Sequence, residues 1–149
     1  MGKVRLSTTS ESKTLESEEK ATQKFAHVVS KKGKQISSGK AYINASFNNT
    51  IITITDDSDN VVAWATAGSL GFSGPKKATP FASSKIVEAL SEKLRNLGLK
   101  KLEIIVKGVG SGRDSALRSF ANQGFEITSI KDATPIPHNG PKPPKVRRV

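Results

Sequence analysis

The sequence predicts a three-layer α/β/α sandwich built around a mixed sheet of five strands. Three strand patterns follow one another between residues 41 and 66, and two helical patterns lie further along the chain. A strand pattern follows each helix, so the order is strand, strand, strand, helix, strand, helix, strand. Consecutive strands joined by tight turns pair antiparallel, whereas strand–helix–strand crossovers join parallel strands and place helices against the sheet.

The first three strands are predicted from alternation and from β-branched residues. Apolar and polar residues alternate over 41–47, and the side chains expected on the buried face are Ala41, Ile43, Ala45 and Phe47. Asn48–Asn49 follows and suits the left-handed conformations of a tight hairpin turn. Residues 50–55 and 61–66 are the second and third strands, and the second of these carries Trp64.

The first helix is predicted from its ends and its apolar stripe. Thr79 suits the N-cap, Pro80 fits the first helical position and Gly98 ends the helix. One stripe of the helix consists of Ile86, Leu90, Leu94 and Leu97.

The second half repeats the alternation of strand and helix. The apolar run 102–106 predicts a strand covered on both faces. A helix follows and ends at Gly124, and residues 125–131 form the last strand. The apolar face of this helix is expected to consist of Leu117, Phe120 and Ala121.

Composition divides the chain into three parts. Residues 1–38 are rich in Ser, Thr, Lys and Glu, which predicts a flexible arm of mixed charge with a frayed helix around 15–25. Residues 39–131 form the α/β domain. Residues 132–149 hold five of the seven prolines, which predicts an extended, basic tail near polyproline II.

The charge balance favours a polyanionic partner. The net charge is +11, from 24 Lys and Arg against 13 Asp and Glu, and nucleic acid is preferred over a merely soluble basic protein. Aromatic residues make up only 5%, which argues against a surface of stacked aromatic platforms. The absence of cysteine excludes disulfides and thiol catalysis. No apolar run reaches the length of a membrane span or resembles a secretory signal.

A glycine-rich turn between the 102–106 strand and the second helix is a candidate anion site. Gly108, Gly110 and Gly112 alternate there, and Ser111 precedes Asp114 by three residues, as in a capping box. Backbone N–H groups at a helix N-terminus bind anions, and Arg113 opposes the helix dipole unless an anion lies nearby. A tight structural turn remains an alternative for the first two glycines.

Other chemistries fit the sequence less well. A dinucleotide fingerprint would need its third glycine at the position of Arg113. The acidic residues Asp56, Asp57 and Asp59 are better explained as turn residues than as metal ligands. A nuclease would need several carboxylates at strand ends, where the strands carry Glu103, Glu126 and little else. With two histidines, both in irregular segments, no Ser-His-Asp set is assigned.

Three basic, irregular segments remain, at 69–79, 107–118 and 134–149. Loops that follow parallel strands gather at one edge of the sheet. Phosphate contacts position a protein without reading sequence, so structured RNA, bound through its shape and backbone, is the partner that fits best.

Several long motifs resemble the small-subunit ribosomal protein eleven family. They occur in the family's order across residues 40–149 without a large gap. The motifs are residues 45–56, Trp64 to Gly68, Thr79 to Ala82, Val106 to Gly108 with Gly110, Gly112 and Arg113, and the run from Asp132 through Pro135–Gly140 to Val149.

The resemblance implies a ribonuclease H-like fold without nuclease activity, with no cofactor and no metal. It implies a structural protein of the small ribosomal subunit that binds small-subunit ribosomal RNA at the platform. The messenger exit path and the Shine–Dalgarno helix lie beside that position, and the expected neighbours are small-subunit proteins six, seven and eighteen. The tail is similar to that of bacterial or organellar members, so the subunit is expected in the cytoplasm or in an organelle.

The basic segments and the resemblance together predict the residues that contact RNA. From the loops and the second helix they are Asn48, Asn49, Ser69, Gly71, Phe72, Ser73, Gly74, Lys76, Lys77, Thr79, Gly110, Gly112, Arg113 and Arg118. From the tail they are Pro135, Pro137, His138, Asn139, Gly140, Lys142, Pro143, Pro144, Lys145, Arg147 and Arg148.

Two features depart from the family pattern. The arm before residue 31 is long and of mixed charge, where family members usually have a short and densely basic arm. Tyr42 and Asn44 stand where histidine is common, so no role is transferred to them.

Overall fold

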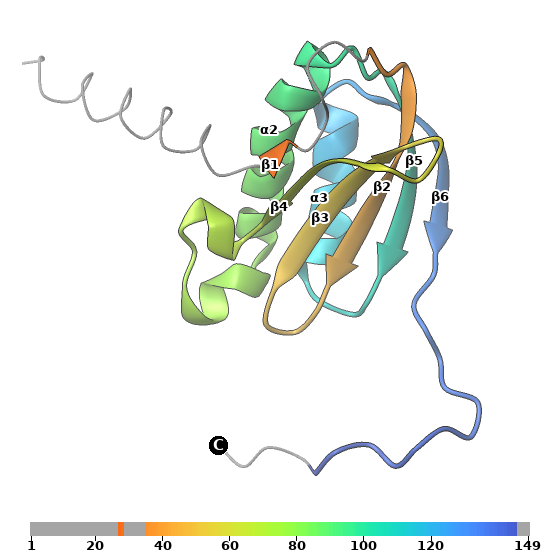
Figure 1. The fold of residues 1–149 in the computed structure, drawn as a ribbon. Coiled ribbons are helices and arrows are strands. Elements are labelled where there is room, and N and C mark those ends of the chain that lie inside the picture. The colour runs from red at the N-terminus through yellow and green to blue at the C-terminus, as the bar shows by residue number, and fades with distance from the viewer. Residues whose placement is uncertain (1–26, 29–34, 146–149) are drawn as a thin grey trace, which may run out of the picture.

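The computed structural model describes residues 27–28 and 35–145, and residues 1–26, 29–34 and 146–149 lie outside the described part. In the described part, five long strands and one two-residue strand form a sheet that is accompanied by two α-helices (Figure 1). The strands are β1 (His27–Val28), β2 (Ser38–Ala45), β3 (Thr50–Asp56), β4 (Val61–Thr66), β5 (Lys101–Lys107) and β6 (Glu126–Asp132). The helices are α2 (Pro80–Asn96) and α3 (Gly112–Asn122), preceded by the short 3-10 helices η1 (Gly68–Leu70) and η2 (Gly74–Ala78).

The order of the strands in the sheet is β1-β4-β3-β2-β5-β6. The predicted meander is present, because β2, β3 and β4 pair antiparallel. β5 pairs parallel with β2 and with β6, as the helical crossovers predict. The predicted α/β class with a mixed sheet of five strands is therefore confirmed, and β1 adds a short sixth strand at the edge.

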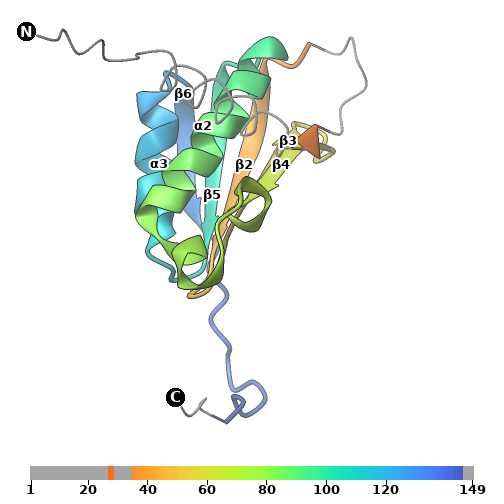
Figure 2. The ribbon, with the colours of Figure 1, turned by 90° about the vertical axis from the view of Figure 1, so that its left-hand side faces the viewer.

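The two helices lie on the same face of the sheet, side by side (Figure 2). Two side-chain hydrogen bonds join them, between the hydroxyls of Ser83 and Ser115 and, at 3.0 Å, between those of Ser119 and Ser84. The described residues thus form two layers, whereas the sequence predicted three.

The direction of the crossovers explains this arrangement. The chain passes from β4 through α2 to β5 and then through α3 to β6, so both crossovers proceed in one direction along the sheet. Because such crossovers are almost always right-handed, two that proceed in the same direction place their helices on the same face. The burial along β5 agrees, since Ile104 is buried while Glu103 and Ile105 are half-buried on the other face. The prediction that this strand is covered on both faces was wrong.

The core lies between the helices and the sheet. Ile86, Leu90 and Leu94 of the predicted stripe are fully buried, and Gly98 follows the helix with a φ of 81°. On α3 the buried side chains are Ala116 and Phe120. Ala121, which was predicted on that face, is exposed because it falls one position off the stripe.

Part of the predicted N-terminal arm belongs to the domain. β1 pairs His27 with Trp64, and Ile36 is 6% exposed and donates its backbone N–H to the Leu97 carbonyl at 3.1 Å. Two short pieces of residues 1–38 are therefore held by the fold. The frayed helix expected around residues 15–25 lies outside the described residues.

Candidate nucleic-acid interface

One edge of the sheet gathers the irregular segments. The carboxyl ends of β2, β5 and β6 lie there, together with the N-termini of α2 and α3 (Figure 1). We call this the tail edge and define it as residues 46–49, 67–81, 107–114 and 132–145. The topology brings residues 69–79 and 107–114 to this edge together with the described part of the third basic segment, residues 134–145.

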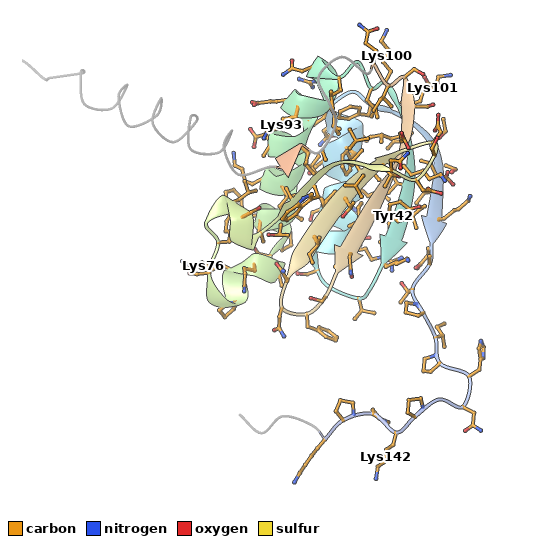
Figure 3. All side chains as sticks on the ribbon, in the orientation of Figure 1. Tyr42, Lys76, Lys93, Lys100, Lys101 and Lys142 are labelled. Atoms are coloured by element: carbon orange, nitrogen blue, oxygen red, sulfur yellow. The ribbon has the colours of Figure 1, made fainter. Side chains whose placement is uncertain are left out.

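Charge is distributed unevenly between the two ends of the sheet. Two carboxylates, Asp114 and Asp132, belong to the tail edge, against six cations, which are Lys76, Lys77, Lys107, Arg113, Lys142 and Lys145. The opposite edge, at residues 35–40, 56–60, 92–101 and 122–126, carries five of each sign. Figure 3 shows Lys76 and Lys142 towards the tail edge and Lys93, Lys100 and Lys101 at the other end. Two helix N-termini add positive dipole ends to the tail edge.

The lysines of the tail edge take part in no ion pair within the described residues. At the opposite edge, Lys40 pairs with Asp59 at 2.8 Å, and this contact raises the pKa of the lysine and lowers that of the carboxyl. Lys101 lies 4.0 Å from Glu126. The opposite edge carries no net charge, so of the two edges it is the tail edge that holds the excess of positive charge.

The loop from residue 67 to 79 presents its lysines on an ordered backbone. The Ser69 hydroxyl donates to the Thr66 carbonyl at 2.8 Å and accepts from the Thr66 N–H at 3.0 Å, so this side chain closes the loop from within. Gly71 and Gly74 have φ values of 86° and 56°, and the space where a Cβ would lie is open. Of the predicted contact residues in this loop, Ser73 and Lys76 are exposed, whereas Phe72 and Lys77 are half-buried.

Thr79 works as the N-cap of α2, as predicted. Its hydroxyl accepts from the Ala82 N–H at 3.3 Å and donates to the Lys76 carbonyl at 2.8 Å. Pro80 occupies the first helical position. Thr79 was predicted to contact RNA, and in the structure its hydroxyl is already engaged in ordering both α2 and the loop at residues 67–79.

The glycine-rich turn packs closely against the β2–β3 hairpin. A Cβ on Gly108, whose φ is 95°, would lie 2.2 Å from the Ala45 carbonyl oxygen, and one on Gly110 would lie 2.3 Å from that of Ser46. The Gly110 N–H donates to the Ala45 carbonyl at 2.9 Å. Gly112 is buried, and its Cβ would lie 2.6 Å from the Thr50 hydroxyl. The geometry agrees with the alternative of a tight structural turn.

The predicted capping box is absent from α3. Ser111 makes no side-chain cap, and its hydroxyl donates instead to the Ala78 carbonyl at 2.8 Å. The spacing to Asp114 was misleading because Ser111 itself has helical backbone angles, with φ −63° and ψ −17°. The side chain of Ser111 therefore joins the glycine-rich turn to the loop at residues 67–79.

Arg113 has an anion beside it, and that anion belongs to the protein. Its guanidinium donates to the Asp132 carboxylate at 2.6 Å and to the Gly108 carbonyl at 3.2 Å. The Thr134 hydroxyl, the Arg113 guanidinium and the Thr134 N–H lower the pKa of Asp132 to about 2. The argument that Arg113 needs an external anion therefore no longer holds, and the arginine fixes the point where the tail leaves β6.

The β2–β3 turn differs from the predicted hairpin. The Ser46 N–H donates to the Asn49 carbonyl at 2.9 Å, and neither Asn48 nor Asn49 has a positive φ. β2 ends at Ala45, so Phe47 leaves the alternation and is 79% exposed rather than buried. A four-residue turn, closed by the Ser46 side chain, replaces the two-residue turn that the asparagines suggested.

The tail runs away from the domain (Figures 1 and 2). Residues 135–145 are all exposed and, as predicted, form no helix or strand. Asn139 is left-handed, with a φ of 52°, so the tail bends within the Pro135–Gly140 run instead of continuing as one straight polyproline rod. Arg118 is exposed on α3, and Arg147 and Arg148 lie outside the described residues.

Sequence reasoning missed several residues of the tail edge. Phe81 and Val109 are each 63% exposed, and Lys107 is exposed at the end of β5. Asp132 and Thr134 were quoted only as part of the tail motif. A strand end next to a glycine turn was the available signal for Lys107, whereas the others depend on contacts between distant segments.

Residues 35–145 show the expected turn chemistry at the opposite edge. The Asp56 carboxylate accepts from the N–H groups of Ser58 at 2.9 Å and Asn60 at 3.0 Å.

No group of three His, Cys, Asp or Glu side chains within the described residues could hold a metal ion. No described helix is long and apolar enough to cross a membrane.

The comparison with protein families identifies one family for this chain. The model of one family, described as Ribosomal protein S11, matches residues 39–148. The match begins within β2 and continues through the tail, so it covers β2 to β6, both α-helices and the segments of the tail edge. Because it spans well over half of the chain, the protein belongs to the ribosomal protein S11 family.

Proposed function

We propose that this chain, a structural protein of the small ribosomal subunit, holds ribosomal RNA through its tail edge. Its family consists of ribosomal proteins, not of enzymes, and implies binding to the RNA of that subunit. The observation that carries the proposal is the uneven charge, with six cations and two carboxylates at the tail edge against a balanced opposite edge. RNA phosphates are the complement of such a surface.

Each segment of the tail edge has its own task in this proposal. The exposed Lys76 and Lys107 and the half-buried Lys77 contact phosphates from the body of the domain, and Lys142 and Lys145 extend the contact along the tail. The ion pair between Arg113 and Asp132 sets the direction in which the tail departs. Since phosphate contacts carry no sequence information, the RNA is recognised through its shape.

The proposed position in the subunit is the platform, beside the messenger exit path and the Shine–Dalgarno cleft. This follows from the resemblance of the motifs, as do small-subunit proteins six, seven and eighteen as neighbours. The Pro135–Gly140 run supports a bacterial or organellar ribosome as the location. In that position the protein supports both assembly of the subunit and translation.

Nothing favours the alternative of a nuclease. Such an enzyme would gather carboxylates around metal ions, and the described residues contain no group of three acidic or histidine side chains able to do so. The carboxylates of the tail edge are Asp132, which is paired with Arg113, and Asp114.

A matched pair of double substitutions tests the proposal. Lys76→Ala with Lys77→Ala removes two charges from the tail edge, and Lys100→Ala with Lys101→Ala removes two from the opposite edge. Binding to deproteinised small-subunit ribosomal RNA is measured over a series of salt concentrations. The logarithm of the affinity falls linearly with the logarithm of the salt concentration, and each lost phosphate contact makes this slope shallower by about 0.7–0.9.

The proposal predicts a slope that is shallower by about 1.4–1.8 for the first variant and unchanged for the second. Equal effects of both pairs would mean that RNA responds to the net charge alone, which would contradict a specific role of the tail edge. The intact chain is also expected to co-sediment with the small subunit in a sucrose gradient, and the first variant is expected to dissociate at lower salt.

A further inference from the structure

Phe47 is the most exposed large apolar side chain of the described residues. Alternation along β2 places it in the core, yet the strand ends at Ala45 and 79% of Phe47 is exposed. Six large apolar side chains are strongly exposed, and four of them belong to the tail edge, namely Phe47, Phe81, Val109 and Ile136. An exposed aromatic ring on an edge with excess positive charge is a candidate contact for nucleic acid.

The turn that carries Phe47 is held from two sides. Within the turn, the Ser46 hydroxyl donates to the Asn49 carbonyl and accepts from the Asn49 N–H, both at 3.0 Å. From outside, the Gly110 N–H donates to the Ala45 carbonyl at 2.9 Å, and the two turns are in close backbone contact. The ring is therefore presented on an ordered backbone, which reduces the entropy lost when a partner binds.

We infer that Phe47 stacks on an unpaired base of the bound RNA. This inference rests on the proposed function and adds to it a contact with a base, where the lysines contact phosphates. The surroundings of Phe47 favour RNA as its partner. Lys107 and the glycine-rich turn lie next to the β2–β3 turn, and the tail edge carries an excess of cations. Single-stranded bases stack on exposed aromatic rings beside such charges.

A protein partner fits this surface less well. Phe47 lies between Ser46 and Asn48 in the chain, and Val109 lies between Gly108 and Gly110, so no large apolar residue adjoins either of them in the sequence. Phe81 is also partly engaged, because its ring meets that of Phe72 edge to face with centroids 6.0 Å apart. A single ring is enough to stack on one base, which is consistent with the low aromatic content of 5%.

The test uses Phe47→Ala, Phe47→Trp and a control at the opposite end of the sheet, Val61→Ala, whose side chain is 42% exposed. The probe is deproteinised small-subunit ribosomal RNA. Stacking predicts that Phe47→Ala binds about tenfold more weakly with an unchanged salt slope, because no phosphate contact is lost. Phe47→Trp is expected to keep its affinity, and RNA should quench its emission beyond the change seen for Trp64 in the unaltered chain.

Three results would overturn the inference. The first is that Phe47→Ala binds the RNA with unaltered affinity, and the second is that RNA does not quench the emission of Phe47→Trp. The third is that Phe47→Ala binds whole subunits more weakly but binds the free RNA normally, which would assign the ring to a protein neighbour. In each case steep, salt-dependent binding by the unaltered chain would leave the proposed function standing. A chain that fails to bind the RNA at all would contradict the proposed function itself.

Discussion

Replacement of Gly110 by alanine tests whether the glycine-rich turn is a packing device. The new Cβ would lie 2.3 Å from the Ser46 carbonyl oxygen and 2.9 Å from the Ala45 carbonyl carbon. Both atoms belong to the backbone, so no side-chain rotation relieves the overlap. The turn must move away from the β2–β3 hairpin, which lengthens the hydrogen bond from the Gly110 N–H to the Ala45 carbonyl.

The expected loss of stability combines two effects. Overpacking costs about 1–3 kcal/mol, and a lost backbone hydrogen bond costs about 0.5–1.5 kcal/mol, so Gly110→Ala should lower the free energy of unfolding by about 1.5–4.5 kcal/mol. At about 4 °C per kcal/mol, the midpoint of thermal unfolding falls by about 6–18 °C. Urea unfolding followed by circular dichroism measures the change directly.

Gly68→Ala is the matched control in the neighbouring loop. Its Cβ would meet nothing closer than the Thr66 hydroxyl at 3.8 Å, and its φ is not positive. We expect this variant to be unchanged or more stable by about 0.4–1 kcal/mol. The reasoning would be refuted if Gly110→Ala unfolded at the same urea concentration as Gly68→Ala but bound ribosomal RNA more weakly, because the glycine would then serve to admit RNA.

Three further predictions concern the N-cap of α2, the hydrophobic core and the stability of the fold at low pH. Thr79→Ala removes the N-cap bond to the Ala82 N–H and should cost about 1 kcal/mol in urea unfolding, with Glu92→Ala at an exposed position of the same helix as the control. Leu90→Ala empties a fully buried site and should cost about 2–5 kcal/mol in the same assay; a smaller loss would contradict the described core. The pKa of Asp132 is lowered from 3.8 to about 2, so its ionised form stabilises the fold above pH 4 and this contribution is lost as the pH falls towards 2. An NMR titration of the Thr134 amide should report that step, and Asp132→Asn should abolish it.

Local patterns were enough to predict most of the fold. The cap at Thr79, the buried stripe of α2 and the glycine after it depend on residues close together in the chain, and all three are confirmed. The gathering of the loops at one edge followed from the order of strands and helices alone. Alternation located β2, although it extended the strand too far, and the β-branched residues located β3.

The failures arose where distant segments meet. The number of layers depends on the direction of both crossovers along the sheet, which a periodicity does not contain. The run 102–106 looked buried on both faces, yet Ile105 lies beside Tyr42 on the face that no described helix covers. An apolar residue tolerates a half-buried position, so composition alone could not separate the two cases.

The candidate site was harder to predict than the fold for the same reason. Arg113 and Asp132 are joined only by the parallel pairing of β5 and β6, so the sequence suggested an external anion where the fold supplies an internal one. Gly108 and Gly110 are close to Ala45 and Ser46 only after β5 has paired with β2. Basic loops and the proline-rich tail, in contrast, were visible in the composition.

The salt dependence of RNA binding by the full chain and by a chain that ends at Pro141 tests the central claim most directly. The deletion removes four cations, Lys142, Lys145, Arg147 and Arg148. If all four contact phosphates, the slope of log affinity against log salt should become shallower by about 3. Replacing the four residues by glutamine in the full-length chain should have the same effect. An unchanged slope in both variants would contradict the claim that the tail edge binds ribosomal RNA.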